Sequence, residues 1–354
     1  MKVISVVGGR PNLIKLSAVH TQVSGKFNHL ILHTGQHYDL SLSQKFFKEL
    51  KIPNPNKNLN VGSDTQARQT GRILTGCEKY FIEQKPDFVI VYGDMNSTLA
   101  AALAAVKLHI PIAHVEAGIR CFDKKVPEEV NRVVTDQVSD LLLTPTINAQ
   151  MLLKKENLGD KAFFCGDVTY DVFLKVVKKI KESHLTKKNL AKNQYYFVTI
   201  HRAENTDDKK RFERILKELQ KLDLPIVLPL HPRTKKMIDK YNLKTLIKNI
   251  KIIEPVTYTQ SLSLQNYSRA IITDSGGIQK ESYFLKKPCI TLRDSTEWPE
   301  TVTSGYNQLF FPDKKPLAYL VNNLKLPKRH PQSFGNGQAG QKIVQAITKF
   351  LKTR

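Results

Sequence analysis

The stretch AIITDSGGIQKE, residues 270–281, decides the fold class of this chain. Its apolar start is typical of a buried strand, and it runs through Asp274-Ser275-Gly276-Gly277 into a helix-forming segment. The bare backbone N–H groups of such a turn, at the positive end of a helix dipole, suit a phosphate or diphosphate. Glu281 lies one helical turn further in, where its carboxylate could accept from a hydroxyl.

The same alternation of short apolar runs and helical segments extends along the chain. Strands are expected at residues 3–7, 30–33, 88–92, 112–115, 196–200, 226–229, 270–273 and 289–292. Helical segments between them imply right-handed β–α–β units and parallel sheets covered on both faces. We therefore predict an α/β protein with two doubly wound Rossmann-like domains that face a cleft, with ligands at the carboxyl ends of the strands.

The length of 354 residues exceeds what one hydrophobic core usually holds, which agrees with two domains. The pattern restarts after Asp167, and a lysine-rich segment at 170–184 predicts one long helix there. We place an N-terminal Rossmann-like domain at 1–168 and a C-terminal one at 169–336. The amphipathic segment within 337–354 predicts a helix that packs back on the first domain.

The chain carries 55 Lys and Arg against 32 Asp and Glu, a net charge of +23. Most of the excess lies after residue 170, which could mark a nucleic-acid surface. Yet the basic residues stand at helical spacing beside apolar ones, and no known nucleic-acid-binding pattern accompanies them. We expect a solvated lysine-rich face and no nucleic-acid partner.

No run of about 18 apolar residues is present, so no membrane insertion is expected. The N-terminal residues read as a strand without the features of a signal peptide, so a cytoplasmic location is expected. The four cysteines are scattered without metal-ligand or disulfide spacing, and no metal site is expected. Neither GxxxxGK[ST] nor GxGxxG occurs, which disfavours a dinucleotide cofactor.

Several polar residues follow the expected strands. Gly8-Gly9-Arg10-Pro11 permits a tight strand-to-helix turn, and Arg10 with Lys15 would face an anion at the helix N-terminus. In the second half, His201 and Arg202 directly follow the strand at 196–200, and His231 stands in the same place one strand later. These positions indicate a binding site for an anionic ligand.

Three acidic sites lie within about 35 residues of the first half. Asp94 follows a strand and could cap a helix, act as a base or bind a metal. Glu116 ends an apolar run, where desolvation tends to raise the pKa of a carboxyl group. Glu128 and Glu129 open a helix, where acidic residues ordinarily compensate the dipole. Acidic residues grouped at element ends favour a proton-transfer site.

Taken together, these segments resemble the non-hydrolysing UDP-N-acetylglucosamine 2-epimerase family. Its motifs G-x-RP-x-x-IK, TGQH, GD-x-x-[ST]T, HVEAG-[LI]-R, PEE-x-NR, HR-x-EN, TDSGG-x-Q-x-E and R-x-[ST]TE-x-PE stand here, in order, at 8–15, 34–37, 93–98, 114–120, 127–132, 201–205, 273–281 and 293–300. The resemblance implies a glycosyltransferase-B-like fold, with UDP held mainly by the second domain and the sugar facing the first. It also implies a homodimer that uses no cofactor and no metal.

The reaction that the resemblance implies is reversible epimerisation of UDP-N-acetylglucosamine to UDP-N-acetylmannosamine. A base removes the C2 proton, UDP leaves C1, and UDP re-adds to a bound 2-acetamidoglucal. Asp94, Glu116 and Glu128 match the family's catalytic acids and His201 its catalytic histidine; which acid is the base stays open. The positions that match substrate contacts are Arg10, Lys15, Arg132, Arg202, His231, Ser275, Gly276, Gly277, Glu281 and Arg293.

The chain departs from the family pattern at Asn12, Ala203 and Trp298, none of which removes a proposed catalytic group. Many bacterial members use the region around Asp39 to bind a second, activating UDP-N-acetylglucosamine and have a further glutamine there. This chain lacks that glutamine, so an activator site does not follow from the resemblance.

Two other enzymatic functions stay open at this point. A 2-epimerase acting on UDP-2,3-diacetamido-2,3-dideoxy-glucuronic acid would need an extra cation for the C6 carboxylate. A UDP-sugar glycosyltransferase of the same fold would bind UDP in the same half, but it would consume the donor only with an acceptor. A nucleic-acid-binding protein would instead show strongly salt-dependent affinity.

Overall fold

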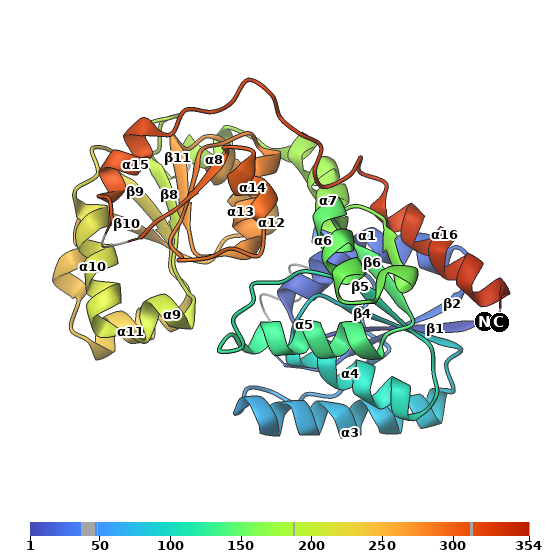
Figure 1. The fold of residues 1–354 in the computed structure, drawn as a ribbon. Helices are drawn as coiled ribbons and strands as arrows, with labels where there is room; N and C mark the ends of the chain where they lie inside the picture. The colour runs from blue at the N-terminus through green and yellow to red at the C-terminus, as the bar shows by residue number, and fades with distance from the viewer. Residues whose placement is uncertain (37–46, 48, 187, 312–313, 354) are drawn as a thin grey trace. The chain divides into compact units, whose positions relative to one another are not determined.

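The structure is a computed structural model that describes residues 1–36, 47, 49–186, 188–311 and 314–353. The chain forms two compact units, Met1–Lys175 with Gln332–Arg354 as unit 1 and Val176–Pro331 as unit 2. Each unit is a parallel sheet with interleaved helices (Figure 1). The prediction of two Rossmann-like α/β domains is confirmed.

The sheet of unit 1 has the strand order β3-β2-β1-β4-β5-β6-β7, and all neighbours in it are parallel. The order reverses between β1 and β4, and doubly wound sheets bind ligands at the carboxyl ends of the strands beside that reversal. The strands are β1 (Lys2–Val7), β2 (Asn28–His33), β3 (Lys57–Asn58), β4 (Phe88–Tyr92), β5 (Ile112–Val115), β6 (Leu141–Thr144) and β7 (Ala162–Phe164).

Helices cover this sheet because each connection between parallel strands must cross back along it. They are α1 (Arg10–Ser24), α3 (Gln66–Gln84), α4 (Asn96–Lys107), α5 (Pro127–Val138), α6 (Ile147–Lys155), α7 (Val168–Val176) and α16 (Ala339–Lys352), with a 3-10 turn at Gly159–Lys161. The alanines of α4 pack against Val89 and Val91 of β4 in a fully buried core. The site residues therefore stand on a rigid support.

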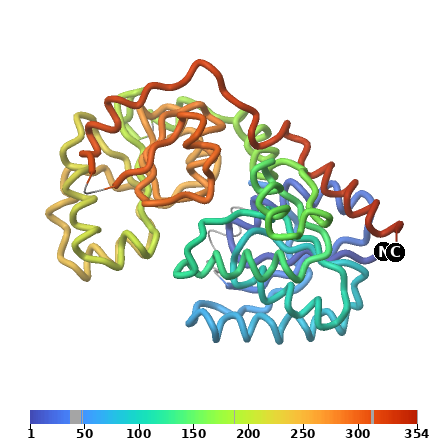
Figure 2. Tube along the Cα trace, viewed as in Figure 1, coloured from blue at the N-terminus to red at the C-terminus, as the bar shows by residue number. Residues whose placement is uncertain are grey.

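The C-terminal helix α16 completes unit 1 by packing on α1, and Figure 2 shows the red end of the chain beside the blue one. A Cβ atom on Gly340 would lie 2.3 Å from the carbonyl oxygen of Ala18, so only glycine permits this close approach. The carboxylate of Asp171 accepts from the amides of Ala339 at 3.1 Å and Gly340 at 2.9 Å, which satisfies the first turn of α16.

The sheet of unit 2 repeats the topology with the order β10-β9-β8-β11-β12-β13, again with parallel neighbours. Its reversal lies between β8 and β11. The strands are β8 (Tyr196–Thr199), β9 (Ile226–Pro229), β10 (Ile250–Ile253), β11 (Ala270–Thr273), β12 (Cys289–Thr291) and β13 (Asn307–Leu309).

The core of unit 2 packs apolar strand residues such as Val198 and Ile272 against Phe212 and Leu216 of α10. Its helices are α8 (Ser183–Thr186), α9 (Ala203–Thr206), α10 (Lys209–Gln220), α11 (Pro232–Lys240), α12 (Tyr258–Asn266), α13 (Gly276–Phe284), α14 (Pro299–Thr303) and α15 (Leu317–Asn323), with 3-10 turns at Val177–Lys179 and Lys244–Ile247. No helix of the described chain is long and apolar enough to cross a membrane.

The predicted single helix over residues 170–184 is wrong. Helix α7 ends at Val176, a 3-10 turn follows at Val177–Lys179, and α8 begins at Ser183. The chain passes from unit 1 to unit 2 beside this break, because unit 1 ends at Lys175 and unit 2 begins at Val176. The units change at Lys175 and again at Pro331, whereas the sequence placed domain boundaries after residues 168 and 336.

Contacts near Lys175 and Pro331, where the chain passes between the units, explain where the unit boundaries lie. Most of α7 belongs to unit 1, where Val172 and Phe173 are buried. On the return, the amide of Asp167 donates to the carbonyl oxygen of Phe334 at 2.9 Å, which ties the incoming segment to unit 1 before residue 337.

Candidate active site

Lys15 of α1 and Glu116, directly after β5, form a buried ion pair with 2.7 Å between Nζ and Oε1. Helix α1 begins at Arg10 with Pro11 in its first turn, as the sequence predicts, and Arg10 is partly exposed at that end. The backbone of Glu116 is left-handed, with φ of 72°, which is uncommon for a residue other than glycine. A Cβ atom on Gly93 would lie 2.3 Å from Lys15 Nζ, so glycine leaves room for the ammonium group.

Asp94, at the end of β4, is held by Arg132 of α5. The Oδ2 atom of Asp94 accepts from Nη2 of Arg132 at 2.5 Å and from Nε at 3.0 Å. Asp94 does not cap α4, because the N-cap residue is Met95 and no side chain accepts there. The sequence left three roles open for Asp94, and the role of helix cap is therefore wrong. Asn131 of α5 donates to the carbonyl oxygen of Asp94 at 2.9 Å and fixes its backbone.

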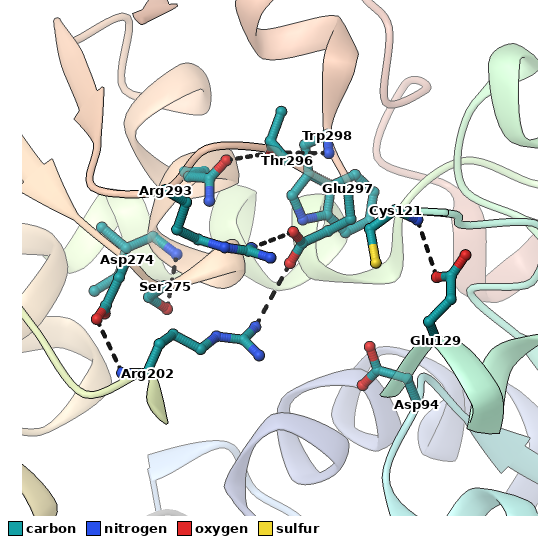
Figure 3. Close-up of polar contacts among 12 residues, drawn as sticks. Asp94, Cys121, Glu129, Arg202, Asp274, Ser275, Arg293, Thr296, Glu297 and Trp298 are labelled. Carbon is teal, nitrogen blue, oxygen red and sulfur yellow. Dashed lines mark hydrogen bonds and ion pairs between the residues drawn. The ribbon is translucent and has the colours of Figure 1, made fainter. Parts of the chain in front are cut away.

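The neighbours Glu128 and Glu129 lie in different surroundings. Glu129 is buried and accepts from the amides of Cys121 at 2.9 Å and Phe122 at 2.8 Å, as Figure 3 shows for Cys121. Burial opposes its ionisation, yet these amides and Arg132, 2.9 Å away, hold the pKa of Glu129 below its ordinary value. Glu129 is thus a structural anchor that sequence reasoning left out of the site, while Glu128 is partly exposed.

In unit 2 the carboxylate of Asp274 connects the loops that follow β8 and β11. The strand order reverses between these two strands, and we call such a position the switch point of the sheet. The carboxylate accepts from the amides of His201 at 2.8 Å and Arg202 at 2.9 Å, and the His201 Nδ1 atom lies 3.1 Å from it. Burial opposes ionisation of Asp274, but the His201 ring and both amides lower its pKa to about 2. Asn205 also donates to this carboxylate, at 3.2 Å. The motifs at 201–205 and 273–281 therefore form one cluster.

Glu297, in the loop after β12, is a second carboxylate with several partners, and the sequence did not single it out. It lies beside Arg293 and 3.6 Å from Nη2 of Arg202 (Figure 3). Arg293 also donates from Nε to Glu204 at 2.8 Å, so it connects the loops after β8 and β12 and takes a supporting place. A Cβ atom on Gly276 would lie 2.2 Å from Glu297 Oε1, so this glycine permits the loop to pack against the start of α13.

The start of α13 has the features expected of an anion site. Ser275 is its N-cap residue, and the hydroxyl accepts from the amide of Ile278 at 3.5 Å. A Cβ atom on Gly277 would meet only Ser275 Oγ, at 3.8 Å, so this position is sterically open. The N–H groups of the first turn, with the helix dipole, suit a diphosphate.

Glu281, one turn into α13, is buried, and burial raises its pKa to about 7 although Gln265 and Lys280 counteract the shift. Gln265 of α12 donates to Glu281 Oε2 at 2.6 Å. Lys280 is also buried, and its Nζ atom lies 4.0 Å from the centroid of the Trp298 ring. Trp298, a departure from the family motif, therefore packs with a cation next to the glycine turn.

His231 is the N-cap residue of α11, and its Nδ1 atom accepts from the amide of Arg233 at 3.2 Å. Its ring centroid lies 5.2 Å from that of His201, so the two predicted histidines of unit 2 are neighbours. His37, the last residue of the TGQH motif, and Asp39 lie outside the described residues. Within the described part, no group of three His, Cys, Asp or Glu side chains could hold a metal ion.

Chemically, the switch point of unit 1 offers carboxylates that lie against cations, Glu116 with Lys15 and Asp94 with Arg132. The switch point of unit 2 offers backbone N–H groups, a guanidinium and two imidazoles beside an open glycine turn. The first arrangement suits proton transfer, and the second suits a diphosphate.

Comparison with known proteins identifies relatives over the whole length. A family model described as UDP-N-acetylglucosamine 2-epimerase matches residues 20–348. A Methanococcus maripaludis protein named as a UDP-N-acetylglucosamine 2-epimerase homolog is 46% identical over 354 residues, which cover 98% of this chain and 99% of the relative. A Pseudomonas aeruginosa UDP-2,3-diacetamido-2,3-dideoxy-D-glucuronate 2-epimerase is 41% identical over 361 residues, which cover 99% and 100%.

Among solved structures, the fold is similar to that of Methanocaldococcus jannaschii UDP-GlcNAc 2-epimerase, crystallised in complex with UDP-GlcNAc and UDP. The TM-score is 0.93 and the sequences are 42% identical, with 99% of this chain and 100% of that chain covered.

Proposed function

This chain belongs to the UDP-N-acetylglucosamine 2-epimerase family, a family of isomerases, and we propose that it interconverts UDP-N-acetylglucosamine and UDP-N-acetylmannosamine. The observation that carries the proposal is where the family motifs lie in the fold. Some lie at the switch point of unit 1 and the others at the switch point of unit 2. Carboxylates gather at the end of β4 and β5, and groups that suit a diphosphate gather at the end of β8 and β11. An elimination of UDP with removal of the C2 proton needs both sets.

In the proposed reaction a carboxylate of unit 1 takes the proton from C2 while the C1–O bond to UDP breaks. A cation beside a carboxylate favours its ionised, proton-accepting form, and both Glu116 and Asp94 have one. Glu128, partly exposed at the first turn of α5, is the third acid available for proton transfer. UDP then returns to C1 of the 2-acetamidoglucal, and C2 receives a proton on the opposite face.

The leaving UDP carries the charge that develops as the C1–O bond breaks. We assign its diphosphate to the first N–H groups of α13 with Arg202, and its ribose hydroxyls to Glu281. His201 stands at the same switch point and is proposed to stabilise the departing diphosphate. Asp274 accepts from the amides of His201 and Arg202 and so fixes the loop that carries both side chains. Groups that are already held in place stabilise such charge without reorganisation.

A second substrate is supported by a specific relative. The Pseudomonas aeruginosa protein named for a diacetamido-glucuronate sugar is 41% identical to this chain, close to the 42% of the Methanocaldococcus jannaschii enzyme. Its sugar carries a C6 carboxylate, which needs a cation in the site. Comparing kcat/KM for UDP-N-acetylglucosamine and UDP-2,3-diacetamido-2,3-dideoxy-glucuronic acid decides between the two substrates.

The reaction itself is tested by incubating the purified protein with each UDP-sugar in D2O and following C2 by NMR. The expected result is loss of the C2 proton signal and appearance of the second epimer, and both should be much slower when Glu116→Gln replaces the wild type. A wild-type protein that leaves C2 undeuterated in both sugars would show the proposed function to be wrong.

A further inference from the structure

A buried polar network lies behind the carboxylates of unit 1. The His114 side chain, on β5, is fully buried. Its Nδ1 atom lies 2.6 Å from Oδ1 of Asp136 on α5, and its Nε2 atom lies 2.7 Å from the carbonyl oxygen of Gly93. Both ring nitrogens of His114 are therefore engaged, on opposite sides of the ring.

These two contacts determine the orientation of the ring. A carbonyl oxygen only accepts, so Nε2 of His114 donates to Gly93. The Asp136 carboxylate lies against the other ring nitrogen, Nδ1. Burial opposes ionisation of Asp136, but His114 and Arg120 hold the pKa of Asp136 below its ordinary value. The ring is therefore held between a carboxylate and a backbone carbonyl.

The other oxygen of Asp136 serves the next turn of the loop after β5. Its Oδ2 atom accepts from the amide of Gly118 at 3.1 Å and lies 2.7 Å from Nη1 of Arg120. Arg120 in turn donates to both carboxylate oxygens of Glu156, at 2.8 and 2.6 Å. Each charge in the network has an opposite charge beside it, as a buried network requires.

The network supports the backbone on both sides of the candidate acids. Gly93 immediately precedes Asp94, and Gly118 lies two residues after Glu116. Gly93, Glu116 and Gly118 all have left-handed backbones, with φ of 63°, 72° and 79°. Glycine adopts this conformation without strain, but a left-handed residue of another type such as Glu116 persists only where its surroundings determine it. His114 bonds the Gly93 carbonyl and Asp136 bonds the Gly118 amide, on either side of the candidate acids.

We propose that Asp136 is a positioning residue, which orients the His114 ring so that Nε2 donates to the Gly93 carbonyl and which itself accepts from the Gly118 amide, so that Asp94 and Glu116 are held in place. Asp136 would not touch the substrate. Its spacing on α5 agrees with this role, because Arg132, which bonds Asp94, lies one turn before it on the same helical face. The consequence for turnover rests on the proposed epimerase function, but the hydrogen bond between His114 and Gly93 does not.

The first measurement is the 15N NMR spectrum of the His114 ring in the wild-type protein, which shows whether Nε2 carries a proton bonded to a carbonyl oxygen. We expect a protonated Nε2 whose proton exchanges slowly with water, because it is buried against the Gly93 carbonyl. In Asp136→Asn this proton should exchange faster, because the ring loses the carboxylate that orients it. An Nε2 without a proton in the wild type would overturn the proposal, and this result stands even where the variant does not fold.

The second measurement is turnover of the same variant. Because a shift of about 1 Å in a reacting group costs about 100-fold in rate, kcat of Asp136→Asn should fall by that order while KM changes little. Asp140→Asn is the matched control, since Asp140 bonds the amide of Ile112 at 2.9 Å at the opposite end of β5. It should keep the wild-type kcat.

The outcomes separate this proposal from the proposed function. An inactive wild type in which Nε2 of His114 carries a protected proton would refute the epimerase function and leave the network intact. An active wild type together with unchanged kcat in Asp136→Asn would refute the positioning role alone, as would an equal loss of kcat in Asp140→Asn.

Discussion

The ammonium group of Lys15 lies 2.7 Å from the carboxylate of Glu116, although the two residues are 101 positions apart in the sequence. The pair joins the first turns of α1 to the loop after β5, and neither side chain is more than 9% exposed. The pair fixes a carboxylate at the switch point of unit 1 and shields it from water, which suits a group assigned to proton transfer.

Glu116→Gln should therefore lower kcat by about 10²- to 10⁴-fold, the usual contribution of a general acid or base. UDP affinity should stay near the wild-type value, because the diphosphate is assigned to unit 2. Initial rates by NMR and UDP titration by calorimetry measure the two effects. Glu83→Gln, an exposed change on α3, is the control. A loss of UDP affinity as large as the loss of kcat would contradict this division.

His201→Ala should also reduce turnover far more than UDP affinity. The ring touches Asp274, but Asp274 keeps its bonds to the amides of His201 and Arg202 when the ring is removed, so the loop should persist. Stopped-flow release of UDP from the sugar measures the chemical step, and equilibrium UDP binding provides the comparison. If His201→Ala mainly raised the UDP dissociation constant, the ring would be a binding group rather than a catalytic one.

Changes at Gly277 should act on UDP binding. A Cβ atom there meets only Ser275 Oγ at 3.8 Å, so Gly277→Ala should fold normally. Gly277→Asp adds a negative charge where the diphosphate is assigned, and we expect UDP affinity to fall by at least about tenfold, or about 1.4 kcal/mol. Gly276→Ala should instead destabilise unit 2, because its methyl group would meet Glu297. Thermal unfolding and UDP calorimetry on the three variants distinguish these effects.

Glu281 should make both stability and UDP affinity depend on pH. Burial raises its folded-state pKa to about 7 from 4.5, so the folded protein binds more protons than the unfolded chain between those values. Its contribution to stability is therefore present below about pH 4.5 and is lost as the pH rises through 7. Glu281→Gln should unfold at a higher temperature than the wild type at pH 8, and the difference should vanish near pH 4.5.

UDP affinity should instead be higher at high pH, because a ribose hydroxyl donates best to an ionised carboxylate. The wild type should bind UDP more weakly as the pH falls below about 7, and Glu281→Gln should bind weakly with little dependence on pH. A pH-independent UDP affinity in the wild type would remove Glu281 from the nucleotide site.

Acid should weaken unit 1 through His29. Burial, with the nearby charge of His20, lowers the pKa of His29 to about 3, and the two Nδ1 atoms lie 3.0 Å apart. Because the unfolded chain takes up this proton near pH 6.5 and the folded chain only near 3, stability falls as the pH drops through that window. The slope should be about 1.4 kcal/mol per pH unit for one proton.

Urea unfolding at several pH values compares the wild type with His29→Asn and with His109→Asn, an exposed control in which asparagine tolerates the left-handed backbone. Only His29→Asn should flatten the acid dependence. An equal slope in all three proteins would assign the acid sensitivity to other groups.

Much of the fold could be predicted because long apolar runs such as Phe88–Tyr92 and Ala270–Thr273 have few alternatives to a buried strand. The strands that escaped prediction include the short edge strands β3, β7 and β13, of two or three residues, which are too short for a pattern to show. The predicted helix at 170–184 failed because propensity cannot reveal where a chain leaves one unit for another.

The sequence predicts which candidate site residues follow strands, but it predicts less well which of these side chains contact one another. Residues that follow parallel strands lie at the carboxyl-end edge of their own sheet. Asp94 and Glu116 in unit 1 and His201 in unit 2 could therefore be placed after strands from the sequence alone. Which base meets which acid depends on contacts between distant elements, such as Lys15 with Glu116. Glu128 and Glu129 are adjacent and chemically alike, so only the fold shows that Glu129 anchors a loop.

The packing of α16 on α1 also bears on how the protein is made. Unit 2 is one uninterrupted segment, whereas unit 1 needs both ends of the chain. During synthesis the ribosome therefore releases all of unit 2 before it releases the helix that covers Ala18 and α1. Unit 1 must wait, with that face uncovered, until α16 has emerged from the ribosome. A protein truncated before α16 would keep every residue of the proposed nucleotide site yet carry an unfinished first domain.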